Sequence, residues 1–247
     1  MQFTAQTSSN GVIERTFTLA EITGVIWSSA SGSDGSPLLL AGHGGGMHKK
    51  APGLVARAHH CVTTYGFTVA AIDAPGHGDR PRNTQDERWV TALRQARVAG
   101  EPIAPIIIEY NSSLAERAVP EWQATIDALQ ALPEIGTDAQ IGYSGMTLAT
   151  AIGLPLVASE PRIAAAVLGG VLVYESVTSA ARQVTVPVEY LLPWDDEVID
   201  RQSGLAMFDA LGSKDKMLHA FPGGHHEIPS ILSENAARFF ARHLGAG

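Results

Sequence analysis

The chain has 247 residues, of which 45% are hydrophobic and 6% aromatic, so it can bury one sizeable core. Its formal charge at pH 7 is −8 and no basic stripe runs along it, which argues against nucleic acid as a partner. A single cysteine, Cys61, rules out a disulfide framework within the chain and any cysteine-based zinc site.

The sequence also lacks the usual signals for membranes and export. The N-terminal stretch "MQFTAQTSSNGVIERTF" is polar, without the apolar segment of a secretory signal. No uncharged apolar run reaches about 18 residues, and the lysine pair Lys49-Lys50 is too small for a membrane-binding patch. We therefore expect a cytoplasmic protein with no membrane partner.

The first half of the chain predicts strands followed by a strand–helix–strand unit. "VIERTFTL" and "EITGVIWSSA" carry β-branched and aromatic residues in partial alternation, which is typical of strands. After the turn cluster "SGSDGSP", the run "PLLLAGHGGG" indicates a strand buried on both faces of a parallel sheet. "APGLVARAHHCVTTYG" then predicts a helix with Cys61 as a small core residue, and "FTVAAIDAPGHGDR" predicts another buried strand.

The second half continues the alternation. "PEWQATIDALQAL" predicts a helix beginning at Pro120, with an apolar stripe made by Trp122, Ile126, Leu129 and Leu132. "AQIGYSG" predicts a strand, and "TLATAIGLPLVAS" a helix broken near Pro155. Further strands are predicted at "IAAAVLGGVLVY", "VPVEYLLPW" and "KMLHAFPGG", and further helices at "SGLAMFDAL" and "SENAARFFARHL". The pattern predicts one α/β domain over residues 1–247, with a mostly parallel sheet flanked by helices.

Residues 79–119 do not fit this alternation. They are charged in "DRPRNTQDERWVTALRQARVAG" and then apolar in "EPIAPIIIEYNSSLAERA". A long insertion with helical stretches of its own predicts a small lid over the carboxyl edge of the sheet, the alternative being a crossover helix with a long surface loop. The apolar residues of "EPIAPIIIEY" and Trp89 are candidates for the roof of a pocket, unless they only pack the lid onto the main domain.

Four predicted strand ends carry glycine, histidine or acidic residues. They are "GHGGGMHKK", "GYSGMTLA", "LPWDDEVI" and "FPGGHHEIP". In doubly wound sheets, functional groups collect at the carboxyl ends of the strands. The order here is candidate nucleophile, acid, histidine, which is the chain order of α/β-hydrolases.

On these motifs, the sequence resembles the α/β-hydrolase superfamily, in particular the small hydrolases related to dienelactone hydrolase and the peptidase-like esterases. "HGGG" resembles the oxyanion loop, "DAPGHG" a strand ending, "DDEV" the acid loop and "GGHHEIP" the histidine loop. The resemblance covers nearly the whole chain. It implies the α/β-hydrolase fold and activity on a small organic molecule, and it implies no metal or organic cofactor.

Two hydroxyls, Ser144 and Thr147, are candidates for the nucleophile in "AQIGYSGMTLATAIGLPL". The sharp strand-to-helix turn that presents such a nucleophile needs small residues two positions before and after it. Thr147 has Gly145 and Ala149 there, whereas Ser144 has Gly142 and the bulky Met146. Thr147 also leaves a strand "AQIGYS" of about six residues, a usual length. Related sequences with "GxSxG" before a similar helix also align Thr147 with the nucleophile.

One argument favours Ser144 instead. A nucleophile at this turn adopts a strained backbone conformation, and a β-branched residue there adds about 1–3 kcal/mol of strain. We favour Thr147 and place the hydroxyl of Ser144 on the pocket floor or inside the end of the sheet. Because a secondary hydroxyl is a less willing nucleophile, the site either works slowly or serves a reaction that needs only a proton shuttle and an oxyanion hole.

The base and the acid each have neighbouring alternatives. The resemblance to Gly-Gly-His loops favours His225 as the base over His226. In "WDDEV", the family's spacing to a following aliphatic residue favours Asp196 over Asp195 and Glu197 as the acid that orients the imidazole.

An oxyanion hole would use the N–H groups of Leu148, which follows the nucleophile, and of Gly45 in "HGGG". The alternative for this glycine run is a tight strand-exit turn without a ligand. His43 and His77 are expected to have structural roles, while His48 is a candidate to border the pocket.

These residues predict a hydrolase that cleaves an ester, thioester or lactone through Thr147, His225 and Asp196. Two alternatives remain open. One is a lyase, isomerase or cyclase that uses the same pocket in a biosynthetic pathway, and the other is a non-catalytic binding protein that keeps the fold.

Overall fold

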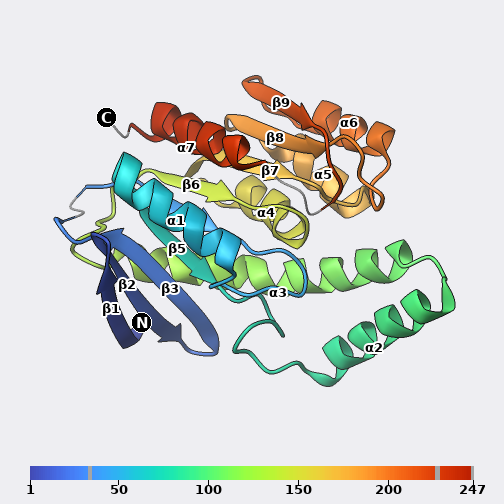
Figure 1. Ribbon diagram of the computed structural model, residues 1–247, viewed down its shortest axis with the longest axis horizontal. Helices are drawn as coiled ribbons and strands as arrows, with labels where there is room; N and C mark the ends of the chain where they lie inside the picture. The colour runs from blue at the N-terminus through green and yellow to red at the C-terminus, as the bar shows by residue number, and fades with distance from the viewer. Residues whose placement is uncertain (33–34, 226–228, 246–247) are drawn as a thin grey trace.

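The computed structural model describes residues 1–32, 35–225 and 229–245, and these form a nine-stranded sheet in the order β1-β2-β3-β5-β4-β6-β7-β8-β9 (Figure 1). The first three strands, β1 (Gln2–Ser9), β2 (Val12–Leu19) and β3 (Ile22–Ser29), form an antiparallel meander, and β3 pairs antiparallel with β5 (Thr68–Ile72). From β5 onward, each strand pairs in parallel with the next one in the sheet order. These strands are β4 (Leu38–Ala41), β6 (Ile141–Ser144), β7 (Ile163–Gly169), β8 (Val188–Pro193) and β9 (Lys216–Phe221). The predicted mostly parallel sheet is confirmed.

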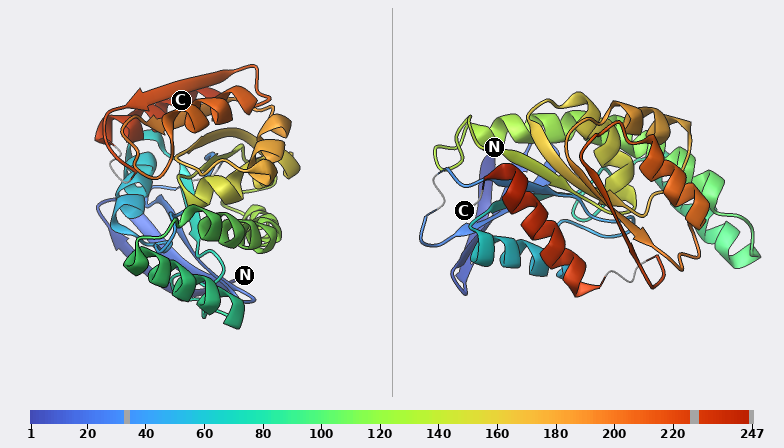
Figure 2. Two further views of the ribbon diagram at one scale, coloured as in Figure 1. Left: turned by 90° about the vertical axis from the view of Figure 1, so that its right-hand side faces the viewer. Right: turned by 90° about the horizontal axis from the view of Figure 1, so that it is seen from above.

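Helices cover both faces of this sheet (Figure 2). The face that we call the back is covered by α1 (Pro52–Tyr65) and α7 (Ser230–Leu244). The front is covered by α3 (Ala104–Gln130), α4 (Leu148–Ser159), α5 (Glu175–Gln183) and α6 (Arg201–Ala210). Each face has its own buried cluster, with Trp27, Phe67 and Phe240 at the back and Ile26, Tyr143 and Leu154 at the front. The alternation of side chains along each strand separates the two clusters.

The helix α1 shows how closely local rules set the element boundaries. Pro52 occupies its first turn, where a missing N–H costs nothing, and Gly66 ends it in the left-handed conformation at φ 70°. Leu54, Ala58 and Val62, four residues apart, are its buried residues. The helix predicted for this stretch is confirmed.

Both proline-based predictions are wrong. Pro120 lies inside α3 rather than at its start, and Pro155 lies inside an unbroken α4. Pro120 and Glu116, whose carbonyl loses its helical donor, are both exposed, so water can bond that carbonyl. In α4, buried residues on nearly every side hold the helix together, as Ala151, Ile152 and Leu154 illustrate.

Two strand predictions also need correction. The strand β1 was not predicted, because its residues are exposed on both faces and show no apolar alternation. The strand expected over "AQIGYS" begins only at Ile141, although the Gln140 carbonyl still accepts a hydrogen bond from Leu38 N at 2.8 Å. Strand length therefore does not favour Thr147 over Ser144 as the nucleophile. The small residues that flank Thr147, Gly145 and Ala149, still favour it.

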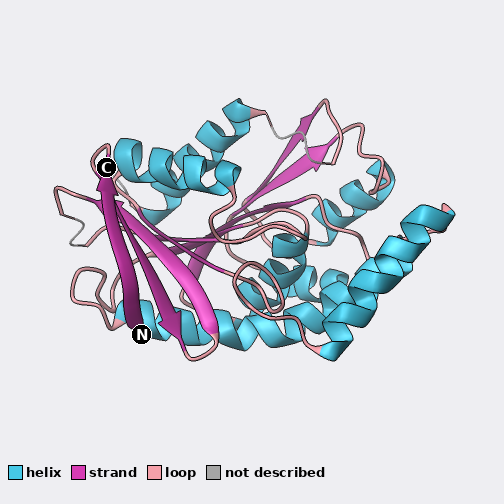
Figure 3. Cartoon of the chain, turned by 60° about the horizontal axis from the view of Figure 1, so that its bottom comes forward, coloured by secondary structure: helices cyan, strands magenta, loops and turns pink. Residues whose placement is uncertain are grey.

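The inserted segment 79–119 contains α2 (Thr84–Ala99) and the first part of α3, which together form a hairpin extending from the body (Figure 1, Figure 3). A capping box between Asn83 and Asp86 starts α2, and Gly100 at φ 68° ends it. Because α3 continues to Gln130 without a break, the hairpin is joined rigidly to the helix layer on its C-terminal side. No helix in the described ranges has the length and apolar character needed to cross a membrane.

Candidate active site

The turn between β6 and α4 holds Thr147 in an unusual backbone conformation. Its φ of 57° and ψ of −117° lie in a region that β-branched residues rarely adopt, which stores about 1–3 kcal/mol of strain. A Cβ added to Gly145 would lie 2.5 Å from the Cβ of Ala149. The strand exit and the first helical turn therefore meet with room only for glycine. This is the close approach that the register centred on Thr147 requires.

A set of hydrogen bonds holds this turn against the end of β7. Thr147 N donates to Gly169 O at 3.0 Å, and Gly145 N donates to Val167 O at 2.9 Å. The buried hydroxyl of Thr150 lies 2.8 Å from Gly145 O and 2.7 Å from Gly169 O, and it accepts from Gly169 N at 2.9 Å. Thr150 was not predicted as a site residue. The available signal was a hydroxyl in the otherwise apolar stretch "LATAIGL".

His225 and Asp196 form a direct pair. His225 Nδ1 lies 2.8 Å from Asp196 Oδ2, and the Asp196 side chain is 1% exposed. The other oxygen, Asp196 Oδ1, accepts from Val198 N at 2.8 Å and from Ile199 N at 2.9 Å. These bonds fix the carboxylate, which in turn orients the imidazole ring through Nδ1.

The neighbours of this pair have other positions. Glu197 Oε2 accepts from His225 N at 3.3 Å, so it holds the loop backbone rather than the ring. The side chain of Asp195 is 60% exposed and accepts from Gly223 N. His226 lies outside the described residues.

Four of the residues predicted for the site line one pocket of about 310 Å³, namely Gly45, Thr147, Leu148 and His225. Helices of the inserted segment supply much of the remaining wall, through Val90, Leu93, Arg97, Ile107, Tyr110 and Asn111. Of the predicted roof residues, Ile103, Ile107 and Tyr110 line the pocket, whereas Trp89 packs against the front core.

The glycine loop after β4 lies directly beside Thr147. A Cβ added to Gly44 would come within 3.0 Å of Thr147 Oγ1, and one added to Gly45 would lie 3.9 Å from the Cβ of Leu148. Because Leu148 is the first residue of α4, its N–H has no acceptor within the helix. The loop and the helix start thus lie side by side next to the Thr147 hydroxyl.

His43 anchors this loop. Its Nδ1 lies 2.9 Å from Gly44 O, and its Nε2 accepts from Ala74 N at 3.0 Å. Burial lowers the pKa of His43 to about 4, so the ring is neutral near pH 7 and the proton sits on Nδ1. A second anchor follows at Lys49, whose N and Nζ both bond the carboxylate of the fully buried Asp73. The expected structural role of His43 agrees with these contacts.

Two residues predicted to bind substrate lie elsewhere. Ser144 lines a separate cavity between α1 and α7, on the back of the sheet, because alternation along β6 turns it away from Tyr143 and the front. His48 is exposed, and its Nδ1 accepts from Lys50 N at 3.2 Å, so the ring folds back onto its own turn. Neither is among the described residues that line the pocket with Thr147.

The lining of the pocket carries arginines, one of which, Arg82, pairs with Glu87 at 3.7 Å. Arg82 and Arg97 line the pocket, and no Asp or Glu does so among the described residues. The hydroxyl of Tyr110 is buried and has no hydrogen-bond partner within the described part of the chain. Burial raises the pKa of Tyr110 to about 12, so this hydroxyl keeps its proton and is able to donate.

Among solved structures, the fold is similar to a cold-adapted esterase from an Arctic intertidal metagenomic library, in its PEG-bound complex. The two are 32% identical over 99% of this chain and 100% of that one, with a TM-score of 0.77. Dienelactone hydrolase from Anabaena variabilis is 19% identical over 99% of this chain and 100% of its own, with a TM-score of 0.66. Acetyl xylan esterase 1 from Thermoanaerobacterium sp. is 15% identical over 98% and 87%, with a TM-score of 0.71. No family model matches the chain, and no curated protein sequence matches it.

Proposed function

The chain belongs to the α/β-hydrolase superfamily, and from that premise we propose that it hydrolyses an ester, thioester or lactone bond of a small organic molecule. The esterase that is 32% identical over almost the full length of both chains supports an ester as the bond cleaved. The lid at residues 79–119 forms part of this proposal, since its helices supply the roof of the pocket.

One observation carries the proposal. Thr147 stands at a strained strand-to-helix turn and lines the same pocket as His225, whose Nδ1 is held by Asp196 at 2.8 Å. Strained turns of this kind are maintained where a side chain must be presented to a ligand. A turn needed only for folding would be served better by an unbranched residue or by glycine.

In the proposed reaction, Thr147 Oγ1 attacks the carbonyl carbon while His225 Nε2 takes the hydroxyl proton. Asp196 stabilises the imidazolium that forms. The N–H groups of Leu148 and Gly45 bind the oxyanion of the tetrahedral intermediate. The leaving alkoxide then takes the proton from His225, which gives an acyl-threonine. Water, activated by His225, releases the acid and restores the hydroxyl.

The threonine methyl requires space that a serine would not. A Cβ on Gly170, which has φ 56°, would lie 3.7 Å from Thr147 Cγ2, so glycine leaves that side of the methyl open. We propose that this gap accepts the methyl during attack. Because a secondary hydroxyl is more hindered, we expect slower acylation than a serine would give at the same position.

The arginines suggest which esters fit. Arg82 and Arg97 lie in the wall; Arg82 is paired with Glu87 at 3.7 Å, whereas Arg97 pairs with no carboxylate of the described residues and can attract an anion. Tyr110 adds a donor that the described protein leaves unpaired. We propose a substrate that carries a carboxylate away from the cleaved bond. Monoesters of short dicarboxylic acids should then show a higher kcat/KM than neutral esters of equal length, and Arg97→Gln should remove that preference.

The reaction is tested with a panel of p-nitrophenyl esters and by intact-mass analysis after brief exposure to an activated ester. We expect turnover that is abolished in His225→Ala, and an acyl adduct that maps to Thr147. Product formation without any adduct would instead favour the lyase, isomerase or cyclase alternative. Absence of turnover across the panel, together with binding of the same esters, would favour a binding protein.

A further inference from the structure

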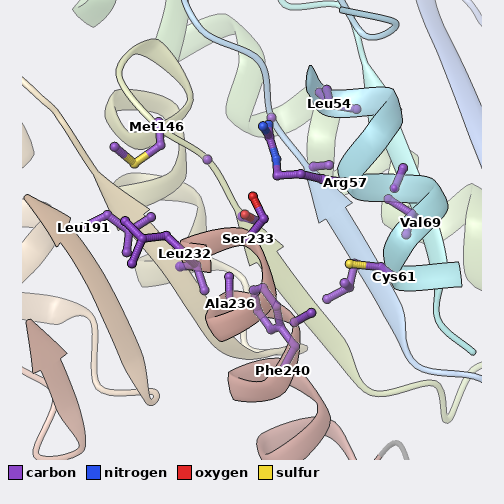
Figure 4. Close-up of a pocket in the computed structure, with 18 residues that line it drawn as sticks. Leu54, Arg57, Cys61, Val69, Met146, Leu191, Leu232, Ser233, Ala236 and Phe240 are labelled. Carbon is purple, nitrogen blue, oxygen red and sulfur yellow. The ribbon is translucent and has the colours of Figure 1, made fainter. Parts of the chain in front are cut away.

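We propose that the cavity between α1 and α7 is a second ligand-binding site, built for a small carboxylate with a short apolar body. This back cavity is lined by residues of both helices and by the ends of β4 and β6 (Figure 4). It lies on the opposite face of the sheet from α4 and α3, and none of its described lining residues also lines the pocket of Thr147.

The back cavity has room for a ligand of a few heavy atoms. Its volume is about 70 Å³, whereas a single water needs about 10–15 Å³ by the same measure. Small side chains on both helices create this space, among them Ala58 on α1 and Ala236 and Ala237 on α7. The side chains of the two helices therefore leave room for a small ligand between them.

Most of the wall is apolar, and three polar side chains converge on the space. Leu54, Leu191, Leu232 and Phe240 are among the apolar lining residues. Arg57 on α1 and Ser233 on α7 point into the cavity from two sides (Figure 4). Ser144, at the end of β6, also lines it. None of these three side chains hydrogen-bonds to another residue of the described chain, which leaves all their donors for a ligand. A few converging polar groups on an apolar wall are typical of small-molecule sites.

Arg57 supplies a positive charge without an acidic partner. Arg57 is exposed to solvent, yet partial desolvation of its side chain lowers its pKa, and no carboxylate of the described residues offsets that effect. Glu234 on α7 is engaged by His60 at 2.6 Å, Tyr65 at 2.7 Å and Arg238 at 2.7 Å. A guanidinium with no carboxylate beside it can take a carboxylate ligand as its bidentate partner.

These features select a monocarboxylate rather than a bulkier anion. The guanidinium fork matches the two oxygens of a carboxylate, and the hydroxyls of Ser144 and Ser233 can donate to the same group. The apolar wall then receives a short hydrocarbon body. One cation and a small volume disfavour a phosphate ester with its second charge.

A bound carboxylate would also touch the machinery of the front pocket from behind. Met146, which lines the back cavity, immediately precedes Thr147, and Leu232 and Ser233 lie in the first turn of α7, which follows the His225 loop. A ligand that contacts α1, the strand-to-helix turn and α7 together binds only the folded chain. It should therefore raise the midpoint of thermal unfolding.

The test uses sodium butyrate and the Thr147→Ala variant, in which the proposed turnover is absent. We expect a saturable rise in the unfolding midpoint and a matching isotherm by calorimetry, with n-butanol at the same concentrations having a much weaker effect. Arg57→Gln should weaken butyrate binding about tenfold or more, and Ser144→Ala or Ser233→Ala should weaken it by a smaller factor. Arg97→Gln is the matched control: it should remove any butyrate bound by the front pocket and leave the affinity of the Arg57-dependent site unchanged.

A second variant keeps the positive charge of Arg57 and fills the back cavity. Ala236→Leu extends an apolar side chain into the back cavity and should block butyrate while Arg57 remains. If Arg97→Gln abolishes binding and Arg57→Gln does not, butyrate occupies the front pocket and the proposal is wrong. Unchanged affinity in Ala236→Leu, or no binding at tens of millimolar butyrate, would also overturn it. Because all variants carry Thr147→Ala, these outcomes do not depend on whether the chain is an esterase.

Discussion

Ser144 and Thr147 are separated by only two residues, yet they belong to two different regions of the molecule. Ser144 ends a regular strand and faces the back cavity, where its described neighbours include Arg57 but neither a histidine nor a carboxylate. Thr147 lies on the far side of a sharp turn and faces the front pocket with His225. Serine is the less hindered hydroxyl, but its position gives it no base. The comparison shows that the backbone path, and not the chemistry of the side chain, selects the candidate nucleophile.

The two regions also differ in what holds them in shape. Around Thr147, strain is offset by hydrogen bonds from the turn to β7 and by the anchored glycine loop. Around Ser144, the strand is unstrained, and the cavity is bounded by apolar side chains of α1 and α7. The ordered polar contacts around Thr147 suit a site that positions reacting atoms, and the mostly apolar wall around Ser144 suits a site that accepts a small ligand.

The largest expected effect is the difference in kcat between Thr147→Ala and Ser144→Ala. Thr147→Ala should lower kcat for an activated ester by about 10³-fold or more, because the attacking atom is lost. Ser144→Ala should leave kcat within about threefold, since its side chain faces the other side of the sheet. Steady-state kinetics on both variants, with Thr147→Ser as a folding control that keeps a hydroxyl, measures the difference. Equal losses in the two alanine variants would break the comparison.

Acidification should lower the stability of the protein through His43, the residue that anchors the glycine loop. The pKa of His43 is lowered by burial to about 4 from the usual 6.5, so the unfolded chain binds the proton more tightly. The stability that the neutral ring provides is present above pH 6.5 and is lost as the pH falls from 6.5 to 4, up to about 3 kcal/mol in the free energy of unfolding. The charges of Asp73, His77 and His48 also affect the pKa of His43. All three residues are kept when His43 alone is replaced, so a difference between the two proteins reports on His43.

The matched variant for this effect is His43→Gln. Urea denaturation of both proteins at several pH values between 4 and 7 measures the free energy of unfolding. As the pH falls, this free energy should decrease more steeply for the parent chain than for the variant. Parallel pH profiles would mean that His43 does not titrate in this range and that the glycine loop is held by Lys49 and Asp73 alone.

Much of this architecture is readable from the sequence because it depends on local rules. Apolar runs that end in glycine or proline mark the buried parallel strands, as β4 and β5 illustrate. The pairing of Gly145 with Ala149 predicted the tight junction at Thr147, which the structure contains as a contact that excludes any larger residue. Proline was a poor guide, because whether Pro120 or Pro155 ends a helix depends on solvent and packing, which the pattern does not encode.

Other features depend on contacts between distant segments and were not predictable. That Ser144 faces the back follows from the exact end of β6, and an uncertainty of one residue reverses the face. The contact of Thr150 with β7 joins residues 19 positions apart. The back cavity requires the packing of α1 against α7, which lie far apart in the sequence. Side-chain chemistry at strand ends is visible in the sequence, whereas the empty space between helices is not.

A smaller effect is expected from adding one carbon to the glycine loop. In Gly44→Ala, the new Cβ would lie 3.0 Å from Thr147 Oγ1 and push the hydroxyl or the loop aside. A displacement of this order should lower kcat/KM by about 10–100-fold. Gly53→Ala on α1 is the control, because its Cβ meets only the flexible end of Arg57 at 3.5 Å, and its activity should be unchanged. Activity in Gly44→Ala equal to that of the control would show that the loop is not part of the site.

The smallest expected effect concerns what maintains the strain at Thr147. Thr150→Val keeps the shape of the side chain but removes the hydroxyl that accepts from Gly169 N, which leaves buried backbone groups unpaired. We expect a loss of about 2 kcal/mol in the free energy of unfolding, measured by urea denaturation. Thr63→Val is the control, since its exposed hydroxyl bonds only the His59 carbonyl of its own helix, and it should change stability by less than about 0.5 kcal/mol.

The two threonine variants together decide where the strain at the turn is balanced. If Thr150→Val loses stability and its kcat falls as well, the hydroxyl holds Thr147 in the conformation that the reaction needs. If stability falls while kcat is retained, the bond of Thr147 N to Gly169 O and the glycine loop suffice to position the nucleophile. Equal stability in Thr150→Val and Thr63→Val would mean that packing of α4 alone imposes the positive φ. In that case the backbone at Thr147 would differ from that at Ser144 because of where α4 packs, and not because of the hydrogen bonds of Thr150.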